Sequence, residues 1–198
     1  MKFILASSSP RRQDLLQRLQ TPFDIILPNV DESKIVSTGN PETYCTALAK
    51  LKANDISQHY PDELVIGADT IVVLGEEIMG KPDDKDAAEY MLKALSGVTH
   101  QVYTGVCLKW VKKNIHHIFA EITTVTFRDL NEKDITHYIE NFLPYDKAGA
   151  YGIQDWSAIF VKEIKGCYDN VVGFPISRFY QELKKLGINI LDTISEPS

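Results

Sequence analysis

The sequence predicts an α/β protein with a mixed, twisted β-sheet flanked by helices. Three observations predict this class. Short apolar runs with strand character alternate with helical patterns, two long alternating stretches follow each other across a short polar turn, and one apolar strand contains a polar interruption. Helices between strands favour parallel pairing, whereas a hairpin requires antiparallel pairing, so the sheet is expected to be mixed.

Length and composition place the chain among ordinary globular proteins. Its 198 residues are 44% hydrophobic and 24% charged, with nine prolines and eleven glycines. This composition excludes a collagen, a coiled coil and a disordered chain. The length is typical of one domain, or of one body with two lobes around a cleft, and we therefore expect residues 1–198 to form a single domain.

The first half of the chain alternates strand and helix patterns. A short apolar strand over 2–6 leads through three serines to Pro10, which is suited to the first position of a helix capped by Ser9. Apolar spacing then predicts a second helix and an interrupted central strand. These later elements are a helix with Tyr44, Ala47, Leu48 and Leu51 on its apolar face, a strand over 64–74 and a turn at 75–77.

The second half contains the predicted hairpin. A helix that starts at Asp83 or Asp84 ends near Leu95, with Gly97 as its stop signal. Two alternating stretches, 99–111 and 115–127, then form antiparallel strands. The remaining expected elements are a helix from the cap Asn131 to a point before Pro144, strands over 159–164 and around Val171–Val172, and a final helix over 176–186.

Charge and cysteine content exclude several classes of function. Twenty-one Lys and Arg against 27 Asp and Glu give a net charge of −6, so a long nucleic acid is not expected as a partner. No window approaches the about 20 apolar residues of a membrane span, and Phe3–Ala6 is too short for a secretory signal. Cys45, Cys107 and Cys167 contain no CxxC pair, which favours reduced thiols in the cytoplasm.

The first candidate for chemistry is the serine loop 7–9 with the arginines that follow it. Free backbone N–H groups at a helix N-terminus receive anions. Arg11 and Arg12 oppose the helix dipole in the first turn, a placement that is favourable if they meet a phosphate group. The alternative is a capped surface helix with two solvated arginines, and this segment alone does not decide between the two.

The second candidate is Asp69, within Gly-Ala-Asp-Thr at 67–70. An aspartate flanked by apolar strand residues loses solvation, so a cation, a metal ion or hydrogen bonds must compensate its charge. Such a carboxylate could hold a hard divalent ion or take a proton from water. Lys81, in Gly-Lys-Pro at 80–82, is a candidate counter-charge. The alternative is an aspartate in a turn with an exposed lysine.

The third candidate is the loop 146–154, where small residues let the backbone approach a ligand closely. Lys147 offers charge, and Gln154 offers a donor and an acceptor for the edge of a base. A loop packed against a sheet explains the glycines equally well. On the second helix, Lys50 and Lys52 are expected to be solvated. Together the three segments favour a small phosphorylated ligand with Mg²⁺ or Mn²⁺.

Four segments in register resemble the Maf family of nucleotide pyrophosphatases, from about Phe3 to Gly187. They are LASSSPRRQDLL, GADTIVV with GKP, LSGVTHQVYTGV, and YDKAGAYGIQ. The resemblance implies an elongated fold with a deep cleft between two lobes, similar to the inosine-triphosphate pyrophosphatases. It also implies hydrolysis of a nucleoside triphosphate to the monophosphate and pyrophosphate, dependent on a divalent metal cation.

The ending YGIQ is similar to the branch of the family that hydrolyses dTTP and UTP, whereas the branch acting on 7-methyl-GTP differs at this point. Where many relatives continue with glycines, this chain has Asp155-Trp156-Ser157. A charge and an indole beside Gln154 could alter base preference or pack the wall of the cleft.

The resemblance also implies roles for individual residues. Asp69 is implied as the catalytic base, with a role as metal ligand left open, and it is expected to hold the Mg²⁺ or Mn²⁺ ion together with Glu32. Arg12, Thr70 and Gln154 are implied in substrate selection. The other residues expected to line the cleft and bind substrate are Ser8, Lys52, Lys81 and Lys147.

Two other functions remain open from the sequence. The chain could be a pyrophosphatase for modified or methylated nucleotides, or a nucleotide-binding regulator of cell division.

The expected exposed edge of the hairpin 99–127 also makes a homodimer possible.

Overall fold

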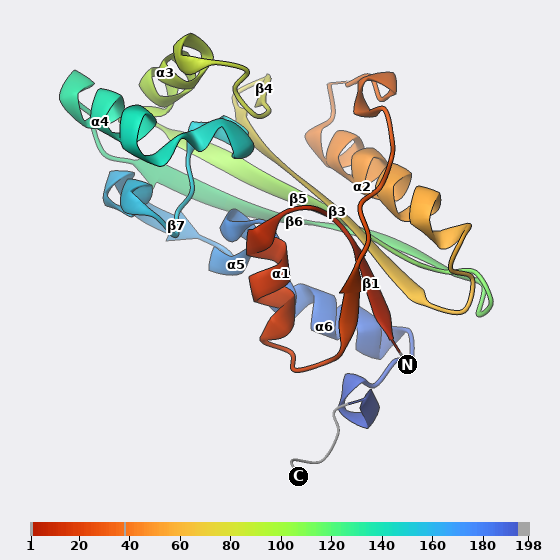
Figure 1. The fold of residues 1–198 in the computed structure, drawn as a ribbon. Helices are drawn as coiled ribbons and strands as arrows, with labels where there is room; N and C mark the ends of the chain where they lie inside the picture. The colour runs from red at the N-terminus through yellow and green to blue at the C-terminus, as the bar shows by residue number, and fades with distance from the viewer. Residues whose placement is uncertain (1, 38, 194–198) are drawn as a thin grey trace. The chain divides into compact units, whose positions relative to one another are not determined.

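The computed structural model describes residues 2–37 and 39–193 and shows a mixed α/β fold (Figure 1). One seven-stranded sheet has the order β2-β1-β3-β5-β6-β7, with β4 paired to β3. β1 is parallel to β2 and to β3, whereas β4 is antiparallel to β3 and β7 to β6. The predicted mixed sheet is therefore confirmed. The strands are β1 (Phe3–Ala6), β2 (Phe23–Ile25), β3 (Leu64–Leu74), β4 (Glu77–Met79), β5 (Thr99–Trp110), β6 (Ile115–Phe127) and β7 (Val161–Lys165).

Three helices begin at side-chain caps. Asn40, Asp84 and Asn131 each accept a hydrogen bond from the backbone N–H three residues later, which satisfies one of the unpaired donors of the first turn. The predicted starts of the helices after Asp84 and Asn131 are confirmed. The helices are α1 (Pro10–Gln17), α2 (Pro41–Ser57), α3 (Lys85–Leu95), α4 (Glu132–Phe142), α5 (Tyr168–Val172) and α6 (Ile176–Lys185), with 3₁₀ turns at Glu32–Lys34, Pro144–Asp146, Ala148–Ala150, Trp156–Phe160 and Ile190–Thr193.

The chain divides into two compact units. The first unit contains Met1–Asp69, Thr104–Glu121 and Gly173–Ser198, and the second contains Thr70–Tyr103 and Ile122–Val172. The first therefore holds β1, β2, α1, α2 and α6, and the second holds β4, β7, α3, α4 and α5, while β3, β5 and β6 supply residues to both. The single domain over 1–198 stays a prediction.

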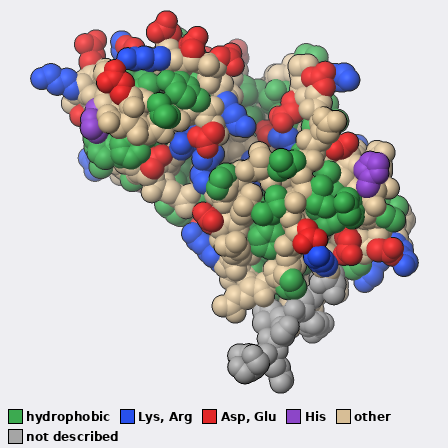
Figure 2. Space-filling model, in the orientation of Figure 1, with side chains coloured by type: hydrophobic (Ala, Val, Ile, Leu, Met, Phe, Trp, Pro, Cys, Tyr) green, Lys and Arg blue, Asp and Glu red, His purple; other side chains and the backbone are tan. Residues whose placement is uncertain are grey.

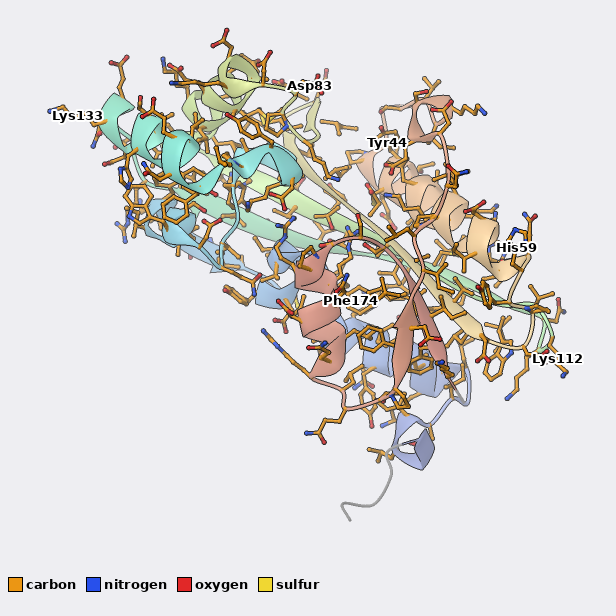
Figure 3. The ribbon with its side chains drawn as sticks, viewed as in Figure 1. Tyr44, His59, Asp83, Lys112, Lys133 and Phe174 are labelled. Atoms are coloured by element: carbon orange, nitrogen blue, oxygen red, sulfur yellow. The ribbon has the colours of Figure 1, made fainter. Side chains whose placement is uncertain are left out.

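In the first unit, α2 packs closely on the sheet through small residues. Its buried face joins Ile4 and Ala6 of β1 and Val65 of β3 in one apolar cluster. A Cβ atom on Gly67 would lie 2.2 Å from the Ala49 carbonyl oxygen, so only glycine permits this approach. Figure 3 shows Tyr44 near the start of α2 and His59 just beyond its end. The buried residues of α2 are Cys45, Leu48, Ala49, Lys52, Ala53, Ile56 and Ser57.

The prediction of which residues form the apolar face of α2 is wrong in part. Among Tyr44, Ala47, Leu48 and Leu51, only Leu48 is buried and the other three are half-buried. The close approach at Gly67 favours the side of the helix that carries small residues, which is rotated away from the larger ones.

The second unit has an aromatic core beneath α4. Tyr138 and Phe142 of α4 stack on the indole of Trp156, and Phe160 meets Tyr138 edge to face. Figure 1 shows α3 and α4 side by side at one end of the sheet, and residues of the two helices are in contact. Tyr138 and Phe160 are buried, Trp156 is half-buried and Phe142 is exposed. The contacts among these rings hold α4 against the turn that follows residue 155.

Two local expectations are wrong. Val171–Val172 lies in α5, not in a strand. The side-chain amide of the preceding residue, Asn170, donates to Val102 O and to Thr123 Oγ1, both at 3.0 Å. These tertiary hydrogen bonds outweigh the strand preference of valine. Ser9 occupies the N-cap position of α1, but its side chain makes no capping bond.

The predicted hairpin is not the edge of the sheet. β5 lies between β3 and β6, and β6 lies between β5 and β7, which pairs with it over Thr124–Phe127. Edge strands are the ones that remain available for pairing with another chain. The argument for a homodimer through this hairpin therefore loses its main support, and the homodimer stays a prediction.

Charged side chains of both signs lie on the surface. Figure 2 shows acidic and basic side chains interspersed over the visible face. Within residues 2–37 and 39–193, no helix combines the length and the apolar character that crossing a membrane requires.

α6 is fixed by one buried carboxylate. The Glu182 side chain is 3% exposed, and its Oε1 accepts hydrogen bonds from Arg178 Nε at 2.9 Å and Lys185 Nζ at 2.8 Å. His117 Nε2 of β6 lies 2.9 Å from Oε2, and Arg178 also pairs with Glu121 of β6 at 3.1 Å. Burial alone raises the pKa of Glu182, but the bonds from Lys185, Arg178 and His117 together lower that pKa to about 2.

This lowered pKa predicts an acid-sensitive contribution to stability. A carboxyl group whose pKa is lower in the folded than in the unfolded state stabilises the fold above its unfolded pKa, here 4.5, and the contribution is lost as the pH falls toward 2. We expect Glu182→Gln to unfold at a lower temperature than the wild type at pH 7, with the difference shrinking steadily below pH 4.5. Thermal unfolding measured from pH 7 to pH 3 checks this, and a difference that stays constant over that range would contradict it.

Candidate active site

The polar interruption of β3 carries an ion cluster. Asp69 is half-buried at that point of the strand, and Lys52 of α2 places its Nζ 2.6 Å from Asp69 Oδ1. The same ammonium lies 3.1 Å from Glu32 Oε1, in the 3₁₀ turn before α2. Lys52 is only 8% exposed, and a buried ammonium requires such partners. The expectation that Lys52 is solvated is therefore wrong, whereas Lys50 is exposed as expected.

Arg12 belongs to the same electrostatic environment. Burial lowers the pKa of its guanidinium and Arg11 lowers it further, whereas Asp69 and Glu32 raise it. Its Nε donates to the Gly173 carbonyl oxygen at 2.9 Å. An arginine held in this way has its fork oriented before any ligand arrives.

Ser7 orients Arg12 from the other side. Ser7 is 5% exposed, and its Oγ accepts a hydrogen bond from Arg12 NH1 at 3.1 Å and another from Ser9 N at 3.2 Å. Ser8, the serine that the resemblance implies in the cleft, is exposed. Ser7 lies in the serine loop 7–9 that the sequence singles out as a candidate, but the resemblance implies Ser8 as the binding serine of that loop. The place of Ser7 directly after the buried strand β1, five residues before Arg12, is the signal that distinguishes it from Ser8.

The donor set can be tested against a divalent ion. Asp69 and Glu32 supply carboxylate oxygens that converge on one cation, Lys52, and the described part of the chain has no group of three or more His, Cys, Asp or Glu side chains suited to a metal ion. Mg²⁺ is commonly bound by one or two carboxylates together with substrate phosphates. Two carboxylates fit an ion that arrives with a triphosphate, and they do not form a closed protein cage.

The second unit holds the remaining candidates. Thr70 directly follows Asp69 in β3, and Lys81 is exposed after β4. The Gly149 N–H donates to the Gly80 carbonyl oxygen at 3.0 Å, which joins the segment of Lys81 to the loop of Lys147. Gly149 has φ +66° and a Cβ there would lie 2.9 Å from Val72, so this contact requires glycine.

The candidates therefore fall into two sets. Asp69, Lys52 and Glu32 are in direct contact within the first unit, which also holds Arg12 and Ser8. That the two sets face one cleft stays a prediction. The set in the second unit consists of Thr70, Lys81, Lys147 and Gln154.

The indole beside Gln154 packs inside the second unit. Trp156 stacks on Tyr138 and Phe142, with ring centroids 6.2 Å and 6.1 Å apart. Of the two roles left open for this ring, packing is the one that its contacts support.

Comparisons with known proteins place the chain in a family. A family profile described as Maf-like protein matches residues 2–186. A protein of Geobacillus sp. is 48% identical over 186 residues, which cover 94% of this chain and 98% of that protein, and it is named dTTP/UTP pyrophosphatase. A protein of Carboxydothermus hydrogenoformans with the same name is 44% identical over 187 residues, 94% of this chain and 100% of that protein.

Among solved structures, the Ham1 protein of Staphylococcus aureus is similar at 16% identity with a TM-score of 0.46, over 65% of this chain and 73% of that chain. The family match includes each of the four segments singled out above, and the relatives extend over nearly the whole sequence. The chain therefore belongs to the Maf family.

Proposed function

We propose that this protein hydrolyses dTTP and UTP to the corresponding monophosphate and pyrophosphate. The observation that carries the proposal is the identity of 44–48% with relatives named dTTP/UTP pyrophosphatase, over nearly the full length of each. The geometry of the first unit supports it, because a half-buried carboxylate, a lysine and an oriented arginine are gathered at one place on the sheet.

The reaction is attack of water on the α-phosphorus. A bond forms between the water oxygen and the phosphorus, and the bond from the phosphorus to the oxygen that bridges to the β-phosphate breaks. Pyrophosphate leaves with that oxygen and its electron pair, and Asp69 accepts the proton of the water. Lys52 occupies Asp69 Oδ1, and a carboxylate has about four lone-pair positions, so capacity for a water molecule remains.

The cations stabilise the charge that develops during this step. Negative charge grows on the nonbridging and leaving oxygens, so oriented positive groups supply most of the catalysis in phosphoryl transfer. In this scheme Arg12, Lys52 and Lys81 neutralise the triphosphate, with Lys147 and Ser8 as further contacts. Thr70 and Gln154 select the nucleotide.

We assign Mg²⁺ or Mn²⁺ to Asp69 and Glu32. A bound divalent ion supplies charge neutralisation on the phosphate oxygens and lowers the pKa of a coordinated water. Lys52 lies within 3.1 Å of a carboxylate oxygen of each residue and so holds both carboxylates in place for such a ligand.

The test is pyrophosphate release from a panel of dTTP, UTP, CTP, GTP and 7-methyl-GTP with Mg²⁺ or Mn²⁺. We expect release from dTTP and UTP, and its loss when a chelator removes the metal, because the triphosphate charge is then no longer neutralised. Restoring excess metal after the chelator provides the control for irreversible inactivation.

The other outcomes identify the alternatives. Preferred release from 7-methyl-GTP or another modified nucleotide would support the proposed reaction but show that its substrate is a modified nucleotide. Nucleotide binding without metal-dependent release would favour a nucleotide-binding regulator of cell division over an enzyme.

We also propose that residues 1–198 act as one domain in the cytoplasm on free nucleotides. Three strands supply residues to both units, which supports joint folding. Cys45, Cys107 and Cys167 are free thiols, and burial raises the pKa of Cys45 and of Cys107 to about 12, so both stay protonated and unreactive.

A further inference from the structure

The turn that carries Gln154 is held by the residue that follows it. The Asp155 N–H donates to the Gly152 carbonyl oxygen at 2.9 Å and closes a turn over residues 152–155. Within this turn Ile153 is 5% exposed and buried, whereas Gln154 is exposed. The backbone therefore anchors one side chain of the turn in the core and presents the other, the amide of Gln154, outward.

The Asp155 carboxylate is the centre of a hydrogen-bond network around this turn. Its Oδ2 accepts a bond from the Tyr138 hydroxyl at 3.1 Å, and its Oδ1 accepts one from Ser157 N at 3.0 Å. The Gly152 N–H in turn donates to the Tyr138 and Ser157 hydroxyl oxygens, both at 3.2 Å. The Tyr138 hydroxyl thus donates its hydrogen to Asp155, and a lone pair of its oxygen accepts the N–H of Gly152, the first residue of the turn.

The same carboxylate lies beside Lys147. Lys147 Nζ is 3.9 Å from Asp155 Oδ2 and 2.8 Å from Asp146 Oδ1. The aliphatic part of Lys147 lies over Gly152, where a Cβ atom would be 2.8 Å from Lys147 Cε and 3.0 Å from Asp155 Oδ2. The Lys147 side chain is only 13% exposed, so its ammonium is confined between two carboxylates and not free in solvent.

We propose that Asp155 is a positioning residue that fixes both Gln154 and Lys147. This proposal rests on the proposed function, in which Gln154 selects the base and Lys147 contacts the triphosphate. Asp155 acts on Gln154 through the turn and on Lys147 through its charge. It sets base selectivity without contacting the base itself, since its two oxygens are directed to Tyr138, Ser157 and Lys147.

The test compares Asp155→Asn with the wild type for kcat and KM on dTTP and on CTP. Asparagine keeps the size of the side chain and an acceptor for Ser157 N, but it removes the charge beside Lys147 and the acceptor of the Tyr138 proton. We expect kcat/KM for dTTP to fall by about tenfold to a hundredfold, mostly through KM, because small displacements of positioning groups have effects of this order. We also expect the preference for dTTP over CTP to decrease.

Two further variants separate positioning from simple stabilisation. Tyr138→Phe removes one hydroxyl and keeps the ring stack, so it should reproduce part of the loss in selectivity. In a Gln154→Ala background, Asp155→Asn should change the dTTP to CTP preference little further, because residues that act through one another are not additive. Asp86→Asn, an exposed carboxylate in the first turn of α3, is the matched control for the loss of one charge, and thermal unfolding of every variant shows whether it is folded.

The outcomes distinguish this inference from the proposed function. An active wild type with an Asp155→Asn variant of unchanged selectivity, or with an equal change in the Gln154→Ala background, overturns the inference alone. A wild type that releases no pyrophosphate from any nucleotide overturns the proposed function. In that case dTTP binding by calorimetry tests the inference. Weaker binding by Asp155→Asn than by Asp86→Asn supports it. Equal binding by the two variants, or no binding by the wild type, overturns it.

Discussion

Asp69→Asn should abolish most pyrophosphate release while the protein remains folded. Asparagine has the same shape and can still accept the hydrogen bond from Lys52 Nζ, so the packing of α2 on β3 is retained. It cannot take a proton from the attacking water and binds a divalent ion poorly. A positioned general base contributes about 10²–10⁴-fold to a rate, so we expect kcat with dTTP to fall by that order.

The matched control is Asp62→Asn. Asp62 also pairs with a lysine, Lys112, but both side chains are exposed, and exposed ion pairs contribute little to stability. Kinetics on dTTP and thermal unfolding of both variants separate loss of chemistry from loss of folding. Near-normal turnover by Asp69→Asn would remove Asp69 from the catalytic role, while an equal decrease in both variants would show an effect of charge in general.

Gly67→Ala should destabilise the first unit and lower activity together. The added Cβ would meet the Ala49 carbonyl oxygen at 2.2 Å and Ala53 N at 2.8 Å, and these are backbone atoms that cannot rotate away. Overpacking of this kind costs about 1–3 kcal/mol, occasionally more, and 1 kcal/mol lowers the melting temperature by about 2–4 °C in a protein of this size. Because α2 must move from β3, the contact of Lys52 with Asp69 should lengthen and kcat should fall.

Gly80→Ala tests whether any extra methyl group has this effect. Gly80 has no atoms within 4 Å of the position that a Cβ would take, and its φ lies outside the left-handed region. We expect its melting temperature to match the wild type within about 1 °C, since surface substitutions usually change stability little. A melting temperature for Gly67→Ala as high as that of Gly80→Ala would refute the close packing of α2 on β3.

The local pattern of the sequence determined the positions of the helices and strands and of the polar residues that interrupt β3. Caps at Asp84 and Asn131 gave the starts of α3 and α4, and alternation gave β5 and β6. The polar residues inside β3 marked Asp69 as a candidate site from the sequence alone. These features depend on residues within about one or two turns of each other, which a sequence displays directly.

Only the tertiary structure decided which groups meet. Arg12 is bound by the carbonyl of Gly173, 161 residues away, and Lys52 meets Asp69 because small residues let α2 approach β3. The strand preference of valine failed in α5 for the same reason, since the partners of Asn170 lie on β5 and β6. Side chains of distant segments become neighbours through packing of the whole core, and the free energy of those contacts outweighs local preference.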